Sequence, residues 1–364
     1  MNRTKQQRDS NIELLRIVLM LLIILMHLIV HGSDLKNLIG DAYITTPKDG
    51  LFTFLYSFIC VSVVSFIFIS GYYGIRFKVK TLLSIVIQAI FYSVSIFIFF
   101  KIFVFKENIL SYDFFKCFFP LSFNSWWFLS AYVGLYILSP LLNKACQYLT
   151  KIQLAGVILF MVYLQASFFP VGYNFYSSDG LSLFSFVVIY LIARFCYIYE
   201  IKIPKPFLIY TLISIFTFLG INLFMKIGWQ SWGWRITTLN IPLVIIGGVC
   251  LFYTFKNIKI QSPIINKISP LLLGVYLLHD SKEVGIYFLY PLMRDINKSI
   301  GSPVEIMIIL LLFTITIFIA GTCIEKIRQI ICAPIVDYIY NVINKFLPKI
   351  LIKLNLVEEA QLNK

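Results

Sequence analysis

The chain has 364 residues, of which 59% are hydrophobic and only 13% are charged. Soluble domains carry about 25% charged residues, so this composition excludes a soluble globular protein and indicates a polytopic membrane protein. The formal net charge of +14 is carried by short basic flanks between apolar runs rather than by one dense stripe. This distribution is typical of membrane orientation and argues against a nucleic-acid partner.

Apolar runs long enough to cross a bilayer predict an all-α protein with about ten transmembrane helices. A spanning helix needs about 20 mostly apolar residues, and turn residues or charges separate the runs of this chain. The expected helices cover residues 12–31, 51–74, 82–105, 124–142, 152–170, 181–199, 207–226, 237–255, 268–289 and 303–324.

The first predicted helix carries four ionisable side chains on one side. Arg16 and His27 are separated by eleven steps of about 100°, which make three turns plus roughly 20°. Glu13 and His31 project about 60° from Arg16 in one direction, and Glu13 is spaced to pair with Arg16. Ionisable residues inside a span usually face a bundle interior or a wet cavity and mark a functional path. The alternatives are a buried structural histidine for His27 and a solvated rim residue for His31.

The distribution of Lys and Arg predicts the orientation of the bundle. Cytoplasmic loops carry an excess of these residues. If the N-terminus is cytoplasmic and ten helices alternate in direction, both termini are cytoplasmic, and the outer flanks receive about a third of the 31 Lys and Arg residues. The residues expected outside are Lys36, Lys48, Lys101, Lys106, Lys116, Lys226, Arg235, Lys282, Arg294 and Lys298.

The segment after the last span predicts a tail distinct from the membrane domain. Residues 1–330 are expected to form the membrane domain and residues 331–364 a cytoplasmic tail. Within this tail, apolar residues recur at helical spacing, and Lys345, Lys349 and Lys353 form a second stripe. This pattern favours a basic amphipathic helix on the inner leaflet; a tail packed on the bundle is the alternative.

The seven cysteines point to neither a disulfide framework nor a metal site. They contain no C-x-x-C pair, and most lie within or beside apolar runs. Free cysteines are commonly buried as small hydrophobic residues, which is the interpretation adopted for Cys60, Cys117, Cys146, Cys196, Cys250, Cys323 and Cys332.

Two side chains of the first helix indicate a reaction with a phosphorylated donor. Imidazole titrates near neutral pH, so a membrane-buried His27 suits a general base or a proton relay. Guanidinium matches phosphate with a two-pronged fork, and the predicted orientation puts Arg16 at the cytoplasmic rim. The donor would enter from the cytoplasm with its reactive end toward the middle of the membrane.

Four stretches of the chain resemble the acyltransferase-3 family of integral membrane acyltransferases. NIELLRIVLMLLIILMHL (11–28) is similar to the family's first helix, with a basic residue, ten intervening residues and a histidine. FISGYYGIRF (68–77) resembles the end of its second helix, WWFLSAYVGLYILSPLLN (126–143) its tryptophan-led helix, and LLLGVYLLHDS (271–281) its late G-x-Y-L segment. The four motifs occur in the family's order and span most of the chain.

The resemblance implies acyl transfer, often of an acetyl group, from cytoplasmic acyl-coenzyme A to a carbohydrate hydroxyl at the outer side. His27 falls on the family's essential histidine and Arg16 on its basic partner. Arg76 falls on the second-helix arginine, where it would bind donor phosphates together with Arg16. For Arg76 the alternative is a flank residue that contacts lipid headgroups.

The tryptophan-led helix departs from the family pattern. Many members have W-S-L-x-x-E there, but after Trp127 this chain reaches Tyr132 with no carboxylate. Tyr132 is expected either to bind a sugar or orient His27, or to be a packed aromatic. His279 and Asp280, toward the outer end of the ninth helix, would bind the acceptor or hydrate the rim.

These observations predict an O-acyltransferase of the bacterial cytoplasmic membrane. It would modify a cell-surface polysaccharide, such as a capsule or an exopolysaccharide, or its lipid-linked precursor. His27 would remove the proton of the acceptor hydroxyl, with direct transfer and a covalent acyl-histidine intermediate both open. One alternative is a transporter or flippase of lipid-linked saccharides with His27 and His31 as a proton relay. The other is a non-catalytic partner of a polysaccharide synthase.

Overall fold

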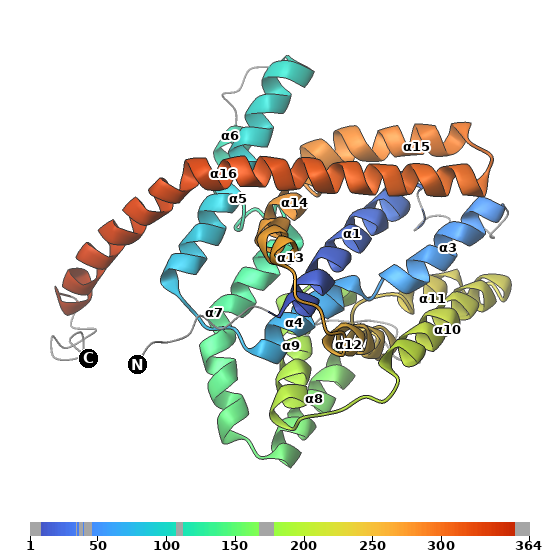
Figure 1. Ribbon diagram of the computed structural model, residues 1–364, viewed down its shortest axis with the longest axis horizontal. Helices are drawn as coiled ribbons and strands as arrows, with labels where there is room; N and C mark the ends of the chain where they lie inside the picture. The colour runs from blue at the N-terminus through green and yellow to red at the C-terminus, as the bar shows by residue number, and fades with distance from the viewer. Residues whose placement is uncertain are drawn as a thin grey trace.

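The computed structural model describes residues 9–33, 35, 39, 46–106, 112–166 and 178–353, and its regular structure is helical throughout (Figure 1). The α-helices up to residue 198 are α1 (Ser10–Gly32), α3 (Pro47–Ile59), α4 (Ser62–Tyr73), α5 (Val79–Phe99), α6 (Tyr112–Lys116), α7 (Trp127–Tyr148), α8 (Lys151–Gln165) and α9 (Leu183–Ile198). They are followed by α10 (Pro206–Lys226), α11 (Gln230–Arg235), α12 (Pro242–Lys256), α13 (Pro263–Ile268), α14 (Leu272–His279), α15 (Tyr290–Ser299) and α16 (Pro303–Lys353). Two segments are π-helical, η1 (Phe100–Phe105) and η4 (Lys282–Leu289).

The helices confirm a polytopic all-α membrane protein. Five apolar helices of the described chain are long enough to cross a bilayer, namely α1, α3 with α4, α5 with η1, α10 and α16. Shorter apolar helices accompany them, namely α8, α9, α12 and α13 with α14.

Two of the expected helices are interrupted in the structure. Within the run 51–74, α3 ends at Ile59 and α4 begins at Ser62. The run 268–289 contains the end of α13, a 3₁₀ turn, α14 and then η4. At the first break, Cys60 and Val61 are apolar, so hydropathy does not distinguish it from continuous helix. The breaks in the second run fall at Ser269, Pro270 and Asp280, whose polar or helix-breaking character an average over the whole apolar run does not show.

Local capping explains where several helices begin. Thr46 and Asp49 form a capping box at α3, with Pro47 in the first turn, and Thr150 and Gln153 form another at α8. Each box satisfies two backbone N–H groups that the first turn leaves without helical partners. Helices α10, α12 and α13 begin with proline, whose fixed φ suits the first helical position.

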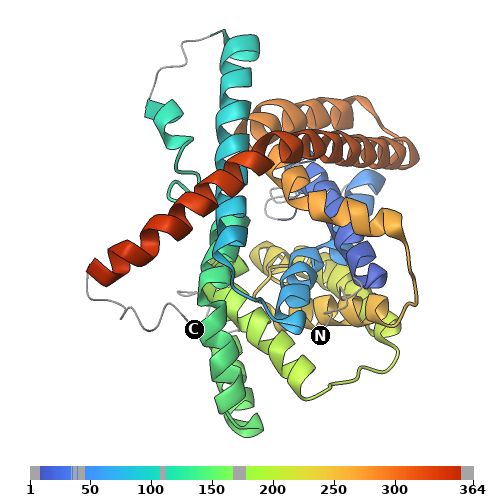
Figure 2. The ribbon, with the colours of Figure 1, turned by 60° about the vertical axis from the view of Figure 1, so that its left-hand side comes forward.

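Helix α1 lies inside the bundle. It packs against α3, α4, α12, α13, α14, α15 and α16 (Figures 1 and 2). In the apolar stretch of α1, 61% of the residues are buried inside the protein, whereas only 22% are buried in the corresponding stretches of α10 and α16. Because lipid is the natural partner of exposed apolar surface, α10 and α16 are peripheral and α1 is the internal helix that carries the site.

Helix α16 continues across residue 330 without a break. It extends to Lys353 and runs past α5 beyond the rest of the bundle (Figure 2). The expected helix in the tail is therefore the end of α16. The boundary between a membrane domain and a tail at residue 330 stays a prediction, because a continuous helix does not mark where the membrane ends.

A buried polar junction joins α5, α14 and α16. Arg328 donates two hydrogen bonds to Glu325, from Nε at 2.9 Å and Nη2 at 2.7 Å. The Tyr92 hydroxyl donates to the same carboxylate at 3.0 Å. Gly274 lies against this group, and a β-carbon there would overlap both Glu325 and the Tyr92 hydroxyl. The glycine of the G-x-Y-L motif therefore makes room for an ion pair.

Candidate active site

The N-terminal half of α1 carries the expected ion pair. Arg16 Nη1 lies 2.8 Å from Glu13 Oε1, as the (i, i+3) spacing predicted. The other carboxylate oxygen of Glu13 accepts a hydrogen bond from the Ser269 hydroxyl. Glu13 is buried while Arg16 is about one-third exposed, so the carboxylate fixes one edge of the guanidinium and leaves the rest available to a ligand.

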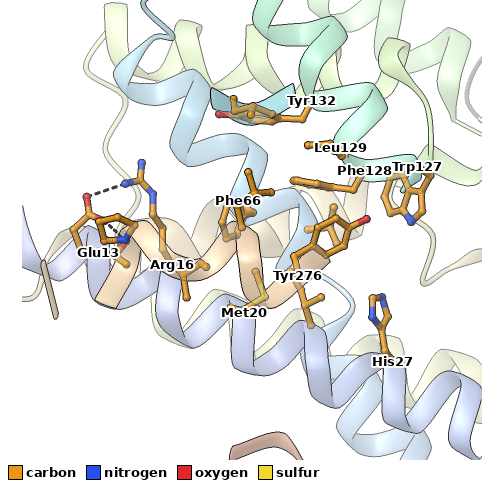
Figure 3. Close-up of a pocket in the computed structure, with 17 residues that line it drawn as sticks. Glu13, Arg16, Met20, His27, Phe66, Trp127, Phe128, Leu129, Tyr132 and Tyr276 are labelled. Carbon is orange, nitrogen blue, oxygen red and sulfur yellow. Dashed lines mark hydrogen bonds and ion pairs between the residues drawn. The ribbon is translucent and has the colours of Figure 1, made fainter. Parts of the chain in front are cut away.

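One cavity of about 360 Å³ joins Arg16 to His27 along this face of α1 (Figure 3). Helix geometry separates the two residues by about 16 Å along the axis. The intervening wall is apolar, with Met20 from α1, Phe66 from α4 and Phe128 from α7. The cavity therefore has a cationic end, an apolar middle and an imidazole at the other end.

At the far end of the cavity, His27 meets two neighbours from the end of α14. Its Nδ1 lies 3.1 Å from His279 Nε2 and 3.5 Å from Asp280 Oδ1. Both imidazoles are buried, and the Tyr276 ring lies edge-on to His279 with centroids 6.1 Å apart. In the part of the chain that the structure describes, no group of His, Cys, Asp and Glu is suited to hold a metal ion.

The hydrogen bonds determine which nitrogen of His27 is basic. His279 Nδ1 lies 2.7 Å from the Val275 carbonyl oxygen, which only accepts hydrogen bonds, so this nitrogen carries a proton. Nε2 of a neutral His279 is then an acceptor, and His27 Nδ1 donates to it. This leaves Nε2 of a neutral His27 with a free lone pair, ready to take a proton.

A second, larger cavity of about 940 Å³ lies on the other side of this cluster. His31, Asp280 and Tyr290 line it, and the His31 ring is 5.9 Å from that of His27 and 4.8 Å from that of Tyr290. None of its lining residues lines the first cavity. The two are called here the inner cavity, which contains Arg16, and the outer chamber, which contains His31.

The structure brings most of the sequence-derived candidates to these two spaces. Trp127 and Tyr132 line the inner cavity. The Tyr132 hydroxyl is 3.3 Å from Ser70 Oγ and points away from His27 (Figure 3), while its ring stacks on that of Phe128. Arg76 is exposed and is not among the residues that line the inner cavity, so its part in donor binding stays a prediction.

Sequence reasoning missed two contributors. Tyr276 lines the inner cavity, with its hydroxyl directed toward the His27 end (Figure 3), and Ser269 anchors Glu13. Tyr276 precedes His279 by three residues in the G-x-Y-L segment, and this helical spacing was a signal for a shared face. Ser269 carried no such signal, because its contact with Glu13 joins positions 256 residues apart.

Most of the chain matches the model of one protein family. Residues 9–325 match the acyltransferase-3 model, described as an acyltransferase domain. No curated protein and no solved structure matches the chain. The match covers both cavities, the histidine pair and most of the chain. The chain therefore belongs to the acyltransferase-3 family and is a membrane acyltransferase.

Proposed function

We propose that this enzyme transfers an acyl group, most simply acetyl, from cytoplasmic acyl-coenzyme A to a hydroxyl of a cell-surface polysaccharide or its lipid-linked precursor. It would act in the bacterial cytoplasmic membrane. The observation that carries the proposal is the inner cavity, which has Arg16 at one end and His27 at the other. Such a space suits a long donor with phosphates at one end and a reactive thioester at the other.

The proposed orientation has ten membrane-spanning helices with both termini in the cytoplasm. The excess of Lys and Arg on the corresponding flanks supports it. In this orientation α1 runs outward, so the Arg16 end of the inner cavity faces the cytoplasm and the outer chamber faces the opposite side. The continuation of α16 beyond residue 330 would then lie on the cytoplasmic side.

In the proposed donor complex, Arg16 binds a phosphate of acyl-coenzyme A. Glu13 occupies one edge of its guanidinium and holds it in place, and Arg76 is proposed as a second contact from the exposed rim. The apolar wall between Arg16 and His27 suits the uncharged arm that carries the thioester. A cavity of about 360 Å³ would take this arm and leave the nucleotide outside.

In the proposed reaction, the acceptor hydroxyl attacks the thioester carbonyl while His27 Nε2 takes its proton. The new C–O bond forms, the C–S bond breaks, and the coenzyme thiolate recovers the proton from His27 as it leaves. The hydrogen bond to His279 holds the reactive tautomer, and Asp280 lies close enough to stabilise the transient imidazolium. His279 and Asp280 thereby supply the support that the tryptophan-led helix lacks.

Transfer of radiolabelled acetyl from acetyl-coenzyme A to cell-envelope glycan in membrane vesicles tests the proposal. A general base contributes typically 10²–10⁴-fold, so His27→Ala should lose that much rate while inserting normally. Met26→Ala, a change at the neighbouring α1 residue outside the cavity, should remain active. Arg16→Met should raise the KM for acetyl-coenzyme A more than it lowers kcat.

Unchanged transfer by well-inserted His27→Ala would exclude its role as the base. Two results together would favour the transporter. The purified protein would bind no acetyl-coenzyme A, and cells that lack the protein would lose glycan export rather than glycan esterification.

A further inference from the structure

The outer chamber collects basic residues that the orientation rule does not explain. Lys101, Lys116, Lys282 and Arg294 line it, and they are four of the ten Lys and Arg residues expected on the outer side. Cationic residues are normally sparse on that side of a membrane protein. Their concentration at one chamber therefore points to a ligand rather than to membrane orientation.

Acidic side chains balance only part of this charge. Lys116 pairs with Asp113 at 2.9 Å and lowers the pKa of that carboxyl, so the pair stays ionised and mutually neutral. Asp280 is directed to His27. Glu283 is the remaining carboxylate in the chamber wall. The wall therefore carries more positive than negative charge.

Two of the cations have no ion-pair partner among the residues that the structure describes. Neither Lys282 nor Arg294 forms a salt bridge there; Lys282 Nζ instead lies 5.7 Å from the centroid of the Tyr287 ring. Both side chains are exposed and both line the chamber. They are free to hold an anionic group that enters from outside.

Two segments of irregular, π-helical backbone form part of the wall of the outer chamber. The two π-helical segments, η1 and η4, both contribute wall residues, and Phe105 of η1 meets Tyr287 of η4 with ring centroids 5.6 Å apart. π-Helical turns are rare and frequently occur at functional sites. Lys101 lies in η1 and Lys282 in η4, so the irregular turns present two of the cations to the chamber.

A buried polar group without a partner also lines the chamber. Trp126 is only 3% exposed, and its Nε1 has no hydrogen-bond partner in the described part of the chain. A buried donor left unpaired has lost its hydrogen bond to water without a replacement, which is unfavourable. An oxygen of a bound ligand would satisfy it, and an aromatic lining with a few polar groups is typical of ligand sites.

The geometry points to an acceptor glycan that carries a negative charge close to the hydroxyl that is acylated. Lys282 and Arg294 would hold the anion, which is either the carboxylate of an acidic sugar or the phosphate of a lipid-linked precursor. Trp126 would donate to a sugar oxygen, and the hydroxyl would reach His27 past His31 and Asp280. This inference rests on the proposed function.

The experiment uses the full-length enzyme in phosphatidylcholine nanodiscs, with radiolabelled acetyl-coenzyme A and three acceptors. These are a glucuronate-containing oligosaccharide, its carboxyl-reduced form, and a neutral saccharide linked to polyprenyl diphosphate. The enzyme should prefer one charged acceptor over the carboxyl-reduced form by at least about tenfold in kcat/KM, equivalent to one good charged contact. Whichever is preferred identifies the source of the anion.

Two variants test the residues that hold the anion. Lys282→Gln and Arg294→Gln should each raise the KM for the preferred acceptor about tenfold and leave affinity for acetyl-coenzyme A unchanged. Lys298→Gln is the matched control, because Lys298 is exposed on the same helix as Arg294 but does not line the chamber.

Equal use of all three acceptors would overturn the inference while leaving the proposed function intact. Identical kinetics in Lys282→Gln, Arg294→Gln and Lys298→Gln would overturn it as well. Failure to bind acetyl-coenzyme A or to acylate any acceptor would overturn the proposed function, and the inference with it.

Discussion

His27 and its partner His279 are 252 positions apart in the chain, yet their ring nitrogens lie 3.1 Å apart. The hydrogen bonds of the cluster define which ring nitrogen of each histidine carries the proton. Val275 fixes the proton of His279, His279 fixes that of His27, and Asp280 lies within ion-pair distance of His27 Nδ1. A single imidazole in an apolar span would have no fixed tautomer, whereas this chain of contacts gives it one.

Replacing His279 tests this positioning role. His279→Ala removes the acceptor for His27 Nδ1, and we expect kcat to fall about 10²-fold, at the lower end of a general base's contribution, with little change in the KM for acetyl-coenzyme A. His279→Gln offers a carbonyl oxygen as the acceptor and should recover much of the rate. If the two variants have the same kcat, His279 does not act by accepting that hydrogen bond.

Part of the site could be predicted from local sequence. The common face of Glu13, Arg16 and His27 follows from helical periodicity, because all three lie on one uninterrupted helix. The contact of His279 and Asp280 with His27 could not be derived in this way, because it depends on how α14 packs against α1. The outer chamber could not be predicted from local sequence either, because its walls come from several segments of the chain.

At the scale of helices, every predicted apolar run contains helix, but five of the described helices are long and apolar enough to cross a bilayer, and the runs did not predict the interruptions. Hydropathy measures whether a segment is stable in lipid, and it is nearly blind to a break whose flanks are apolar. Two of the interruptions matter most: the one between α13 and α14 contains Ser269, which contacts Glu13, and the end of α14 before η4 carries His279, which meets His27.

The junction of α5, α14 and α16 depends on a complete ion pair. Arg328→Met would leave the Glu325 carboxylate buried without its cation, which costs about 3–5 kcal/mol. We expect a large drop in the thermal unfolding temperature of the purified protein. The double variant Glu325→Leu with Arg328→Met removes both charges and should be markedly more stable than the single variant. Equal destabilisation of both proteins would show that the charge itself is unimportant there.

On the scale of the whole molecule, the structure has two unequal spaces on either side of one cluster of side chains. The inner cavity is small and mostly apolar, whereas the outer chamber is larger and charged. In the proposed orientation this difference matches two substrates that come from opposite sides of the membrane, one presenting an uncharged arm and the other a polar glycan.

Cysteine labelling tests that orientation. In a protein whose exposed Cys323 is replaced by serine, Lys106→Cys should react with a membrane-impermeant maleimide in intact cells. Lys259→Cys, on a flank assigned to the cytoplasm, should react only after permeabilisation. Both positions are exposed, so access to the reagent depends on the side of the membrane. The reverse labelling pattern would show that the protein has the opposite orientation. Arg16 would then face away from the cytoplasm, which contradicts its proposed contact with a cytoplasmic donor.

The separation of the two spaces has a consequence for how the molecule works. A transporter must alternate between inward-open and outward-open states so that its cargo can cross without opening a leak. Among the residues that the structure describes, none lines both spaces, and His27, at the end of the inner cavity, contacts His279. In the proposed orientation, the enzyme would be accessible from both compartments at once without becoming a channel. In the proposed reaction neither substrate would traverse the bilayer, because the acceptor hydroxyl and the thioester would meet at His27 and only the acyl group would change carrier.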